Sequence, residues 1–297
     1  WEDAGASINY YRDDELPSLM WLRQSADWRD KLQQLPSPGR PFGIAILGGE
    51  LTSDDLEQIG KLKHLQRVDV SGVKFPEAGL KSLSESSLTH VTLNSTPVSD
   101  TGVAHLASQT GLVELDLSNT QITDEGLEPL VAMKDLEVLK LNGNYRVTGA
   151  GMDHLVPLIS LKNLSLSRTK VSDEGLSRLS GLKQLESLDL GATPVTDAGL
   201  RHLARMPSLT TLDLPSGVSD AGLSRLTALE NLQSLRVASG AKITGEALAK
   251  LSQLQSLDVS VHETFDDEDL QPAARLTELR RFSLSATKIT DAGLAHL

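Results

Sequence analysis

Leucines recur in the pattern LxxLxL along most of the chain, and each copy is followed by a polar turn and a second, shorter apolar pattern. Successive copies begin 22 to 25 residues apart, and an earlier, less regular copy begins near Phe42. A fixed period of this length is typical of a solenoid, in which thin repeats stack and bury one another's apolar side. The opening residues of the clear copies are Leu65, Leu88, Leu112, Leu136, Leu161, Leu185, Leu209, Leu232, Leu254 and Leu279.

Each repeat is predicted to hold one short strand and one short helix, and the copy LDLSNTQITDEGLEPL illustrates both. Its alternating leucines indicate a strand. Thr123 and Asp124 mark the helix start, since either side-chain oxygen can accept a hydrogen bond from a free backbone N–H. Gly126 removes a side chain where the helix and strand layers come close. Leu127 and Leu130 lie three residues apart, so they share one helical face and return to the core.

This pattern resembles the leucine-rich repeat family, and within it the bacterial subtype LxxLxLxxTxVTDxGLxxL, similar to planctomycete-type and F-box-linked repeats. The resemblance implies an α/β solenoid (a horseshoe) of about ten to eleven repeats, with a parallel β-sheet on the concave face and short helices on the convex face. It also implies a protein that binds other proteins and is not an enzyme. No F-box is recognisable before the repeats, so a ubiquitin-ligase role is not implied. Good copies of the subtype span residues 112–130, 161–179, 185–203 and 279–297.

The repeat pattern divides the chain into two parts. Residues 1–41 form a non-repeating N-terminal flank, and residues 42–297 form the repeat domain. The flank is predicted to be a helical cap, because the first layer of a solenoid would otherwise expose its leucines. The last copy stops within its helix pattern, and we expect further residues or another chain to cover it. The apolar residues that suggest the capping helices are Leu19, Leu22, Trp28, Leu32 and Leu35.

The ninth position of the repeat departs from the family pattern. Many leucine-rich repeats carry asparagine there, where its amide binds the backbone of the turn. Here asparagine occurs only at Asn144, threonine takes its place in five other repeats, and Val73, Gly217, Gly240 and His262 interrupt the series. Threonine has fewer hydrogen-bonding atoms and a shorter reach, so we expect its ladder to satisfy less of the turn. The threonines are Thr96, Thr120, Thr169, Thr193 and Thr287.

Composition narrows the function classes. The chain has 297 residues, a formal net charge of −12, only 3% aromatic residues and no cysteine. Disulfides and thiolate metal sites are excluded, and the acidity argues against a nucleic-acid partner. No apolar run reaches the ~18 residues of a membrane span, so no membrane insertion is expected within this chain. If a signal or anchor was removed before Trp1, the bacterial cell envelope or secretion is favoured; otherwise the protein is cytoplasmic.

Residues that could carry chemistry have structural interpretations. No metal or cofactor site is predicted, because no nucleophile elbow, phosphate loop or metal-ligand spacing occurs. The acidic loop 263–269 is read as the solvated start of a helix near Asp267 rather than as a calcium site, for which the alternating-oxygen spacing is absent. A hydrolase using His90 is kept as a weaker hypothesis. The acids that recur at the helix start are Asp100, Asp124, Asp173, Asp197, Asp220 and Asp291.

Strand residues that alternate with the inward leucines form two polar columns on the concave face. We expect Asp116 to pair with Lys140, and Arg236 to pair with Asp213 and Asp258, across neighbouring strands. Neither column contains Trp, Tyr or Phe, so the usual anchors of tight interfaces are missing. The candidate partner-binding residues are Asp116, Lys140, Asp189, Asp213, Arg236 and Asp258 on the strands, with Tyr145 and Arg146 in the altered loop GNYRVTGAG.

The main functional hypothesis is therefore a non-catalytic scaffold for protein–protein interaction, which presents a polar concave face to an unidentified protein. The alternative is a structural spacer or targeting arm of a larger protein whose activity lies outside this chain. In either case we expect a monomer or a weak oligomer.

Overall fold

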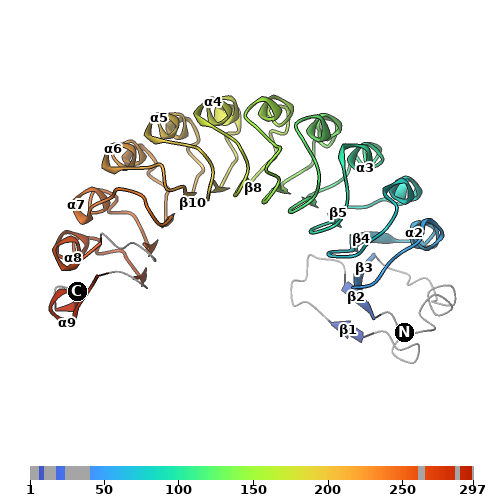
Figure 1. The fold of residues 1–297 in the computed structure, drawn as a ribbon, viewed down its shortest axis with the longest axis horizontal. Coiled ribbons are helices and arrows are strands. Elements are labelled where there is room, and N and C mark those ends of the chain that lie inside the picture. The colour runs from blue at the N-terminus through green and yellow to red at the C-terminus, as the bar shows by residue number, and fades with distance from the viewer. Residues whose placement is uncertain (1–6, 10–17, 24–40, 260–264, 285–287, 296–297) are drawn as a thin grey trace. The chain divides into compact units, whose positions relative to one another are not determined.

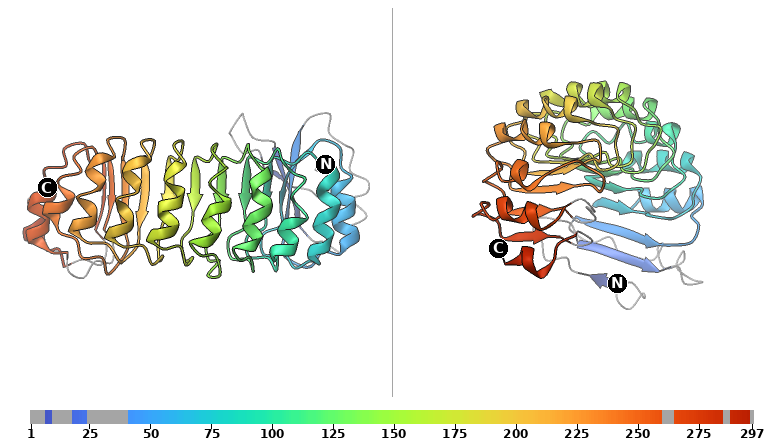
Figure 2. Two further views of the ribbon diagram at one scale, coloured as in Figure 1. Left: turned by 90° about the horizontal axis from the view of Figure 1, so that it is seen from above. Right: turned by 60° about the vertical axis from the view of Figure 1, so that its left-hand side comes forward.

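A computed structural model describes residues 7–9, 18–23, 41–259, 265–284 and 288–295. The chain divides into two compact units, Trp1–Asn144 and Tyr145–Leu297. In each unit short strands lie on one face and short helices on the opposite face, joined by turns (Figures 1 and 2). Strands β3 to β13 begin eleven consecutive repeats among the described residues, which confirms the predicted α/β repeat fold.

In the first unit the strands pair in sequence order, parallel throughout except for the antiparallel pair of β1 with β2. Its elements are β1 (Ser7–Asn9), β2 (Ser18–Arg23), β3 (Phe42–Leu47), α2 (Ser53–Gly60), β4 (Leu65–Asp69), η2 (Glu77–Glu85), β5 (His90–Thr92), α3 (Asp100–Ala104), β6 (Glu114–Asp116), η3 (Glu125–Ala132) and β7 (Val138–Lys140), where η marks a 3₁₀ helix.

In the second unit the strands from β8 to β13 also pair in order and in parallel. Its elements are η4 (Ala150–His154), β8 (Asn163–Ser165), α4 (Asp173–Arg178), η5 (Leu179–Gly181), β9 (Ser187–Asp189), α5 (Asp197–Leu200), η6 (Leu203–Arg205), β10 (Thr211–Leu214), α6 (Asp220–Leu223), η7 (Leu226–Ala228), β11 (Ser234–Val237), α7 (Gly245–Leu248), β12 (Ser256–Asp258), α8 (Asp267–Ala273), β13 (Arg281–Ser283) and α9 (Asp291–Leu294).

The core is a stack of aliphatic layers between the strands and the helices. In the repeat that begins at Leu185, Leu188 of β9, Leu190 just after it, and the helix leucines Leu200 and Leu203 are all at most 1% exposed. Each contributes roughly 1.5–3 kcal/mol by its burial. Helices of four to six residues such as α4 and α5 are too short to form alone, so this packing must hold them.

The N-terminal flank differs from the expected helical cap. Leu19 and Leu22 lie in β2, which adds to the edge of β3 in parallel, so the prediction of a helix is wrong for these two residues. The leucine spacing was compatible with either element, and pairing with the exposed edge of β3 satisfies backbone groups that a helix would leave open. Trp28, Leu32 and Leu35 lie outside the described residues. The boundary at residue 41 stays a prediction.

Carboxylates join successive repeats on the helix side. Asp173, the first residue of α4, accepts hydrogen bonds from the backbone N–H (2.8 Å) and the hydroxyl (2.7 Å) of Thr196, the residue that caps α5 in the following repeat. Five equivalent pairs have the same geometry. The recurring aspartates mark helix starts, as predicted. The carboxylates of Asp100, Asp173, Asp197 and Asp220 in addition bind the following repeat. The equivalent pairs are Glu77–Ser99, Asp100–Thr123, Asp197–Ser219, Asp220–Thr244 and Asp267–Thr290.

The ladder at the ninth position follows the expected division between threonine and asparagine. The Thr193 hydroxyl makes one hydrogen bond, to the Leu190 carbonyl of its own turn (2.7 Å), and Thr96, Thr120 and Thr169 bind their own turns in the same way. Asn144 binds the Leu141 carbonyl of its own turn and also the Leu117 carbonyl of the preceding repeat. Thr287 lies outside the described residues.

Candidate functional site

The two polar columns predicted from the sequence are present in each unit. Neighbouring strands pair Arg67, His90, Glu114 and Val138 in one column of the first unit, and Asp69, Thr92, Asp116 and Lys140 in the other. In the second unit the columns are Asn163, Ser187, Thr211, Ser234, Ser256 and Arg281, and Ser165, Asp189, Asp213, Arg236, Asp258 and Ser283. The inward leucines fix this register, because a slip by one residue would expose them.

Four residues on adjacent strands of the second unit, Asp189, Asp213, Arg236 and Asp258, are here called the acidic strip. Arg236 lies between two carboxylates, with Nη1 3.2 Å from Asp213 and Nε 3.3 Å from Asp258, as predicted. The Arg236 side chain is 63% exposed, so these pairs contribute at most about 1 kcal/mol each to stability. The strip is therefore a weak source of stability but a well-defined charged surface.

The acidic strip has more negative than positive charge. Three carboxylates and one guanidinium give a formal charge of −2 (−3 + 1). Burial raises the pKa of Asp213, and the charges of Asp189 and Asp258 raise it further while Arg236 opposes them. Asp189 is held by the backbone N–H of Gly191, which donates to it at 2.8 Å. A cationic group of a partner would relieve this repulsion. Beside the strip runs a column of hydroxyls, Ser187, Thr211, Ser234 and Ser256.

In the first unit the expected pair of Asp116 with Lys140 is wrong. Lys140 Nζ lies 2.7 Å from Oε1 of Glu114, which sits in the other column of the adjacent strand. Asp116 is 8% exposed, and one of its oxygens accepts the backbone N–H of Ser118 (2.9 Å). The short aspartate turns toward its own chain, while the longer glutamate reaches the lysine.

Replacing Lys140 with methionine is expected to reverse the pKa shift of Glu114. Burial raises the pKa of Glu114, but the hydrogen bond and charge of Lys140, aided by Arg67 and His90, hold it below its ordinary value. Without Lys140 the effect of burial dominates and the pKa rises. A carboxyl-carbon NMR titration of both proteins measures the change.

The pKa shift of Glu114 also determines how the stability of the fold changes with pH. In the wild type Glu114 stabilises the fold above its unfolded pKa, and this contribution is lost as pH falls through the lower folded pKa. In the Lys140→Met protein, ionised Glu114 destabilises the fold and acidification relieves it. A titration that left the pKa of Glu114 in the variant below its ordinary value would contradict the assignment.

His90 lies between Arg67 and Glu114, its neighbours in the column predicted from the sequence, and its contact with Thr89 was not predicted. Thr89 Oγ1 is 2.8 Å from His90 Nδ1, and Glu114 and Arg67 occupy the paired positions on either side. Burial, with a smaller effect of Arg67, lowers the pKa of His90, while Glu114 opposes the shift. The repeat register was the one signal that could have brought these residues together.

The loop candidates Tyr145 and Arg146 are both exposed, and 65% of Tyr145 is accessible. Tyr145 is the most exposed large apolar side chain in the part of the chain that the structure describes. An exposed aromatic beside an arginine has the composition of an interface anchor. Their role in binding stays a prediction.

The acidic loop has a structural role in its described part. Asp266 caps α8, and its backbone N–H donates to Asp269 (3.3 Å). Asp269 also accepts the backbone N–H of Gly245 (2.8 Å), and Asp267 binds Thr290 in the following repeat. Residues 260–264 lie outside the described chain. Among the described residues, no group of three His, Cys, Asp or Glu side chains could hold a metal ion, and no helix is long and apolar enough to cross a bilayer.

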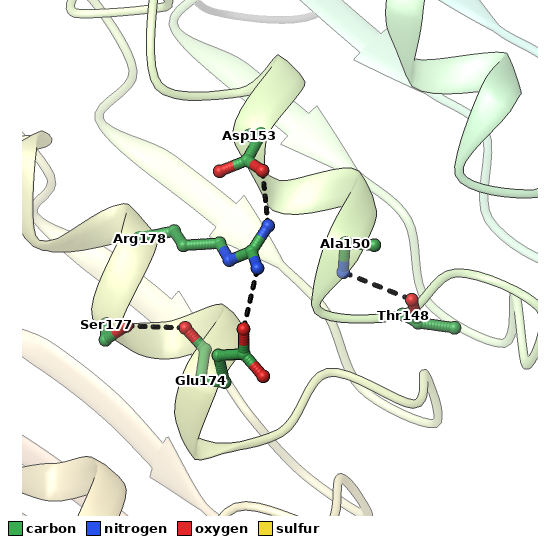
Figure 3. A network of polar contacts seen from close by, with 6 residues as sticks. All are labelled: Thr148, Ala150, Asp153, Glu174, Ser177 and Arg178. Carbon is green, nitrogen blue, oxygen red and sulfur yellow. Dashed lines mark hydrogen bonds and ion pairs between the residues drawn. The ribbon is translucent and has the colours of Figure 1, made fainter.

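The helix side of the second unit carries a different polar cluster (Figure 3). Arg178 of α4 contacts Asp153 of η4 in the preceding repeat and Glu174 one helical turn earlier, the latter at 2.7 Å. Asp153 and Glu174 are mostly exposed, so the cluster adds little to stability. It links neighbouring helices rather than forming a binding surface.

Comparison with known proteins agrees with the repeat architecture. A family model described as a leucine-rich repeat region matches residues 117–291. An internalin of Listeria monocytogenes is similar in structure, with a TM-score of 0.56 and 21% identity over 91% of this chain and 86% of that one. Internalin C2 of the same organism has a TM-score of 0.53 and 26% identity over 70% of this chain and 84% of its own. No protein with a curated function matches.

Proposed function

The chain belongs to the leucine-rich repeat family, and we propose that it is a non-catalytic scaffold that binds a partner protein on its strand-lined face. The observation that carries this proposal is the acidic strip, where Arg236 lies between Asp213 and Asp258 and the surplus charge is negative. The partner surface that fits it carries lysine or arginine.

Two features support a polar contact of moderate affinity. The strip is flanked by the small hydroxyl side chains of neighbouring strands, which can exchange hydrogen bonds with a partner. The columns hold no aromatic residue, and aromatic residues supply most of the energy of tight interfaces. We propose that Tyr145 and Arg146 form a second contact with the partner, at the loop that follows β7.

Neutralising the acidic strip is expected to lower partner recovery by about tenfold or more, equivalent to ~1.4 kcal/mol. The variant is Asp189→Asn, Asp213→Asn and Asp258→Asn, which keeps the size of each side chain. The measurement is cross-linking capture from cells of the source organism, followed by mass spectrometry. The matched control is Glu230→Gln, Glu268→Gln and Glu278→Gln, which changes the charge by the same amount at exposed positions away from the strands.

Equal recovery by the strip variant and the wild type would refute the assignment of the strip. The alternative function is a spacer or targeting arm of a larger protein, which the missing aromatic anchors favour. Under that alternative neither variant changes capture, and the full reading frame contains an additional catalytic or membrane domain.

A further inference from the structure

We propose that Arg67 and His90 on the strand face of the first unit form a binding site for an acidic side chain of a partner protein. This inference rests on the proposed function, because it names a second chemical feature that the partner of the strand face must carry. The site belongs to a different unit from the acidic strip and is centred on a cation, Arg67.

The first observation is the unsatisfied guanidinium of Arg67. Its Nε is buried and has no hydrogen-bond partner, the single such side-chain atom among the described residues. An unpaired buried donor costs about 1–3 kcal/mol, so this arginine is held in place at the expense of stability. Arg67 as a whole is only half-buried. A planar carboxylate can accept two parallel hydrogen bonds from a guanidinium.

The second observation is that the neighbouring acids are engaged elsewhere. Glu114 is bound by Lys140 at 2.7 Å. Asp69, on the same strand as Arg67, accepts from the backbone N–H (3.0 Å) and the hydroxyl (2.6 Å) of Ser71 in its own turn. Glu114 and Lys140 compensate each other's charge, and Arg67 makes no ion pair among the described residues. With Asp69 and Asp116 included the charged residues of these strands sum to −1 (+2 − 3), so the positive character of the site is confined to Arg67 and protonated His90.

The third observation is the orientation of His90. Thr89 Oγ1 lies 3.2 Å from the carbonyl oxygen of Gln66 and 2.8 Å from His90 Nδ1. When His90 is protonated both ring nitrogens are donors: Nδ1–H donates to the Thr89 hydroxyl, and Nε2–H becomes a second donor beside Arg67. The neighbouring strands place Arg67 on one side of His90 and Glu114, with Lys140, on the other.

Binding of an acid is consequently coupled to proton uptake. A bound carboxylate stabilises the charged imidazole and raises its pKa above that of the free protein, in which burial holds the pKa low. Affinity must then increase as pH falls through the titration range of His90, because the complex binds the proton more tightly than the free protein.

The test is an NMR titration of the whole chain with the blocked peptide Ac-Gly-Glu-Gly-NH2, which carries one carboxylate. We expect saturable shifts of the Arg67 side-chain N–H and the His90 ring C–H, with a Kd on the order of 1–10 mM, as suits a single contact. The His90 titration midpoint should rise in the presence of the peptide. Ac-Gly-Gln-Gly-NH2, which has the same shape without the charge, should produce no saturable shift.

Arg67→Met separates binding from folding. The variant removes the unsatisfied buried donor, so we expect it to lose peptide binding at least tenfold while retaining wild-type stability or exceeding it. Arg281→Met is the matched control, since Arg281 lies in the equivalent column of the second unit and is exposed. It should leave the titration unchanged.

Equal shifts with the Glu and Gln peptides, or unchanged binding by Arg67→Met, would overturn the proposal. It would also be overturned if Ac-Gly-Gln-Gly with a free C-terminal carboxylate bound and Ac-Gly-Glu-Gly-NH2 did not, because the ligand would then be a chain terminus and not an acidic side chain. The acidic-strip experiment does not involve these residues. Failure of one assignment can therefore be told apart from failure of the other.

Discussion

Replacing Asn144 with alanine is expected to lower the free energy of unfolding by about 3 kcal/mol, because buried hydrogen bonds lose their partner. Asn144 is 2% exposed. Its Nδ2 donates to the carbonyls of Leu117 (2.8 Å) and Leu141 (3.0 Å), and its Oδ1 accepts from the backbone N–H of Thr120 (3.1 Å) and lies 3.0 Å from the Thr120 hydroxyl. The Thr120 hydroxyl donates to Leu117 (2.8 Å), and the Leu141 carbonyl keeps the backbone N–H of residue 144 (3.4 Å). The group most exposed to loss is therefore the Thr120 N–H.

Asn144→Thr provides the graded control. Threonine at this position should bind the Leu141 carbonyl as Thr120 binds Leu117, but it leaves the Thr120 N–H without an acceptor. The expected order of stability in urea denaturation, followed by circular dichroism, is wild type, then Asn144→Thr, then Asn144→Ala. An alanine variant within ~0.5 kcal/mol of the wild type, the range of ordinary surface substitutions, would show that the ladder does not depend on this amide.

The repeat fold could be read from the sequence because leucine spacing determines which residues face inward. Once Leu188, Leu212 and Leu235 are placed in equivalent layers, the residues that follow them, Asp189, Asp213 and Arg236, must align. The pairing of Arg236 with two aspartates followed from that alignment. Strand register is strongly specified wherever one face is buried.

Side-chain direction between repeats could not be read in the same way. The prediction that Lys140 pairs with Asp116 compared residues directly opposite each other, but the longer Glu114 reaches the lysine diagonally. The column of Arg67, His90 and Glu114 followed from the strand register, but the hydrogen bonds of these side chains did not. Burial and hydrogen-bond satisfaction, which distinguish Arg67, are properties of the folded chain.

The link between the recurring Asp and Gly was missed for a related reason. Each aspartate was interpreted within its own repeat, as a helix-start acid, and each glycine as a point of close layer contact. In the structure the aspartate of one repeat binds the capping Thr or Ser of the next and lies against the glycine there. Asp197, Ser219 and Gly222 form one such group. The motif TDxGL therefore describes a contact between repeats.

Gly222→Ala tests this contact, and its sign is opposite to the expectation from helix propensity. Alanine is favoured over glycine inside a helix by about 0.8–1 kcal/mol, so α6 taken alone would be stabilised. A Cβ at position 222, however, would meet a carboxylate oxygen of Asp197 and lie 3.0 Å from both Leu200 Cδ1 and Val218 Cγ1. The carboxylate would have to move away from Ser219, so we expect a net loss of about 2 kcal/mol, within the usual cost of overpacking.

Gly181→Ala is the matched control, because a Cβ there would meet no atom within 4 Å. This substitution should stabilise the protein by about 0.4–1 kcal/mol, since it restricts the unfolded chain without a clash. Both variants are compared with the wild type by urea denaturation. If Gly222→Ala gained stability as Gly181→Ala does, the contact between Asp197 and Gly222 would not restrict this position. Opposite signs would mean that position 222 requires glycine because of its contacts with the preceding repeat, Asp197 and Leu200, and with Val218.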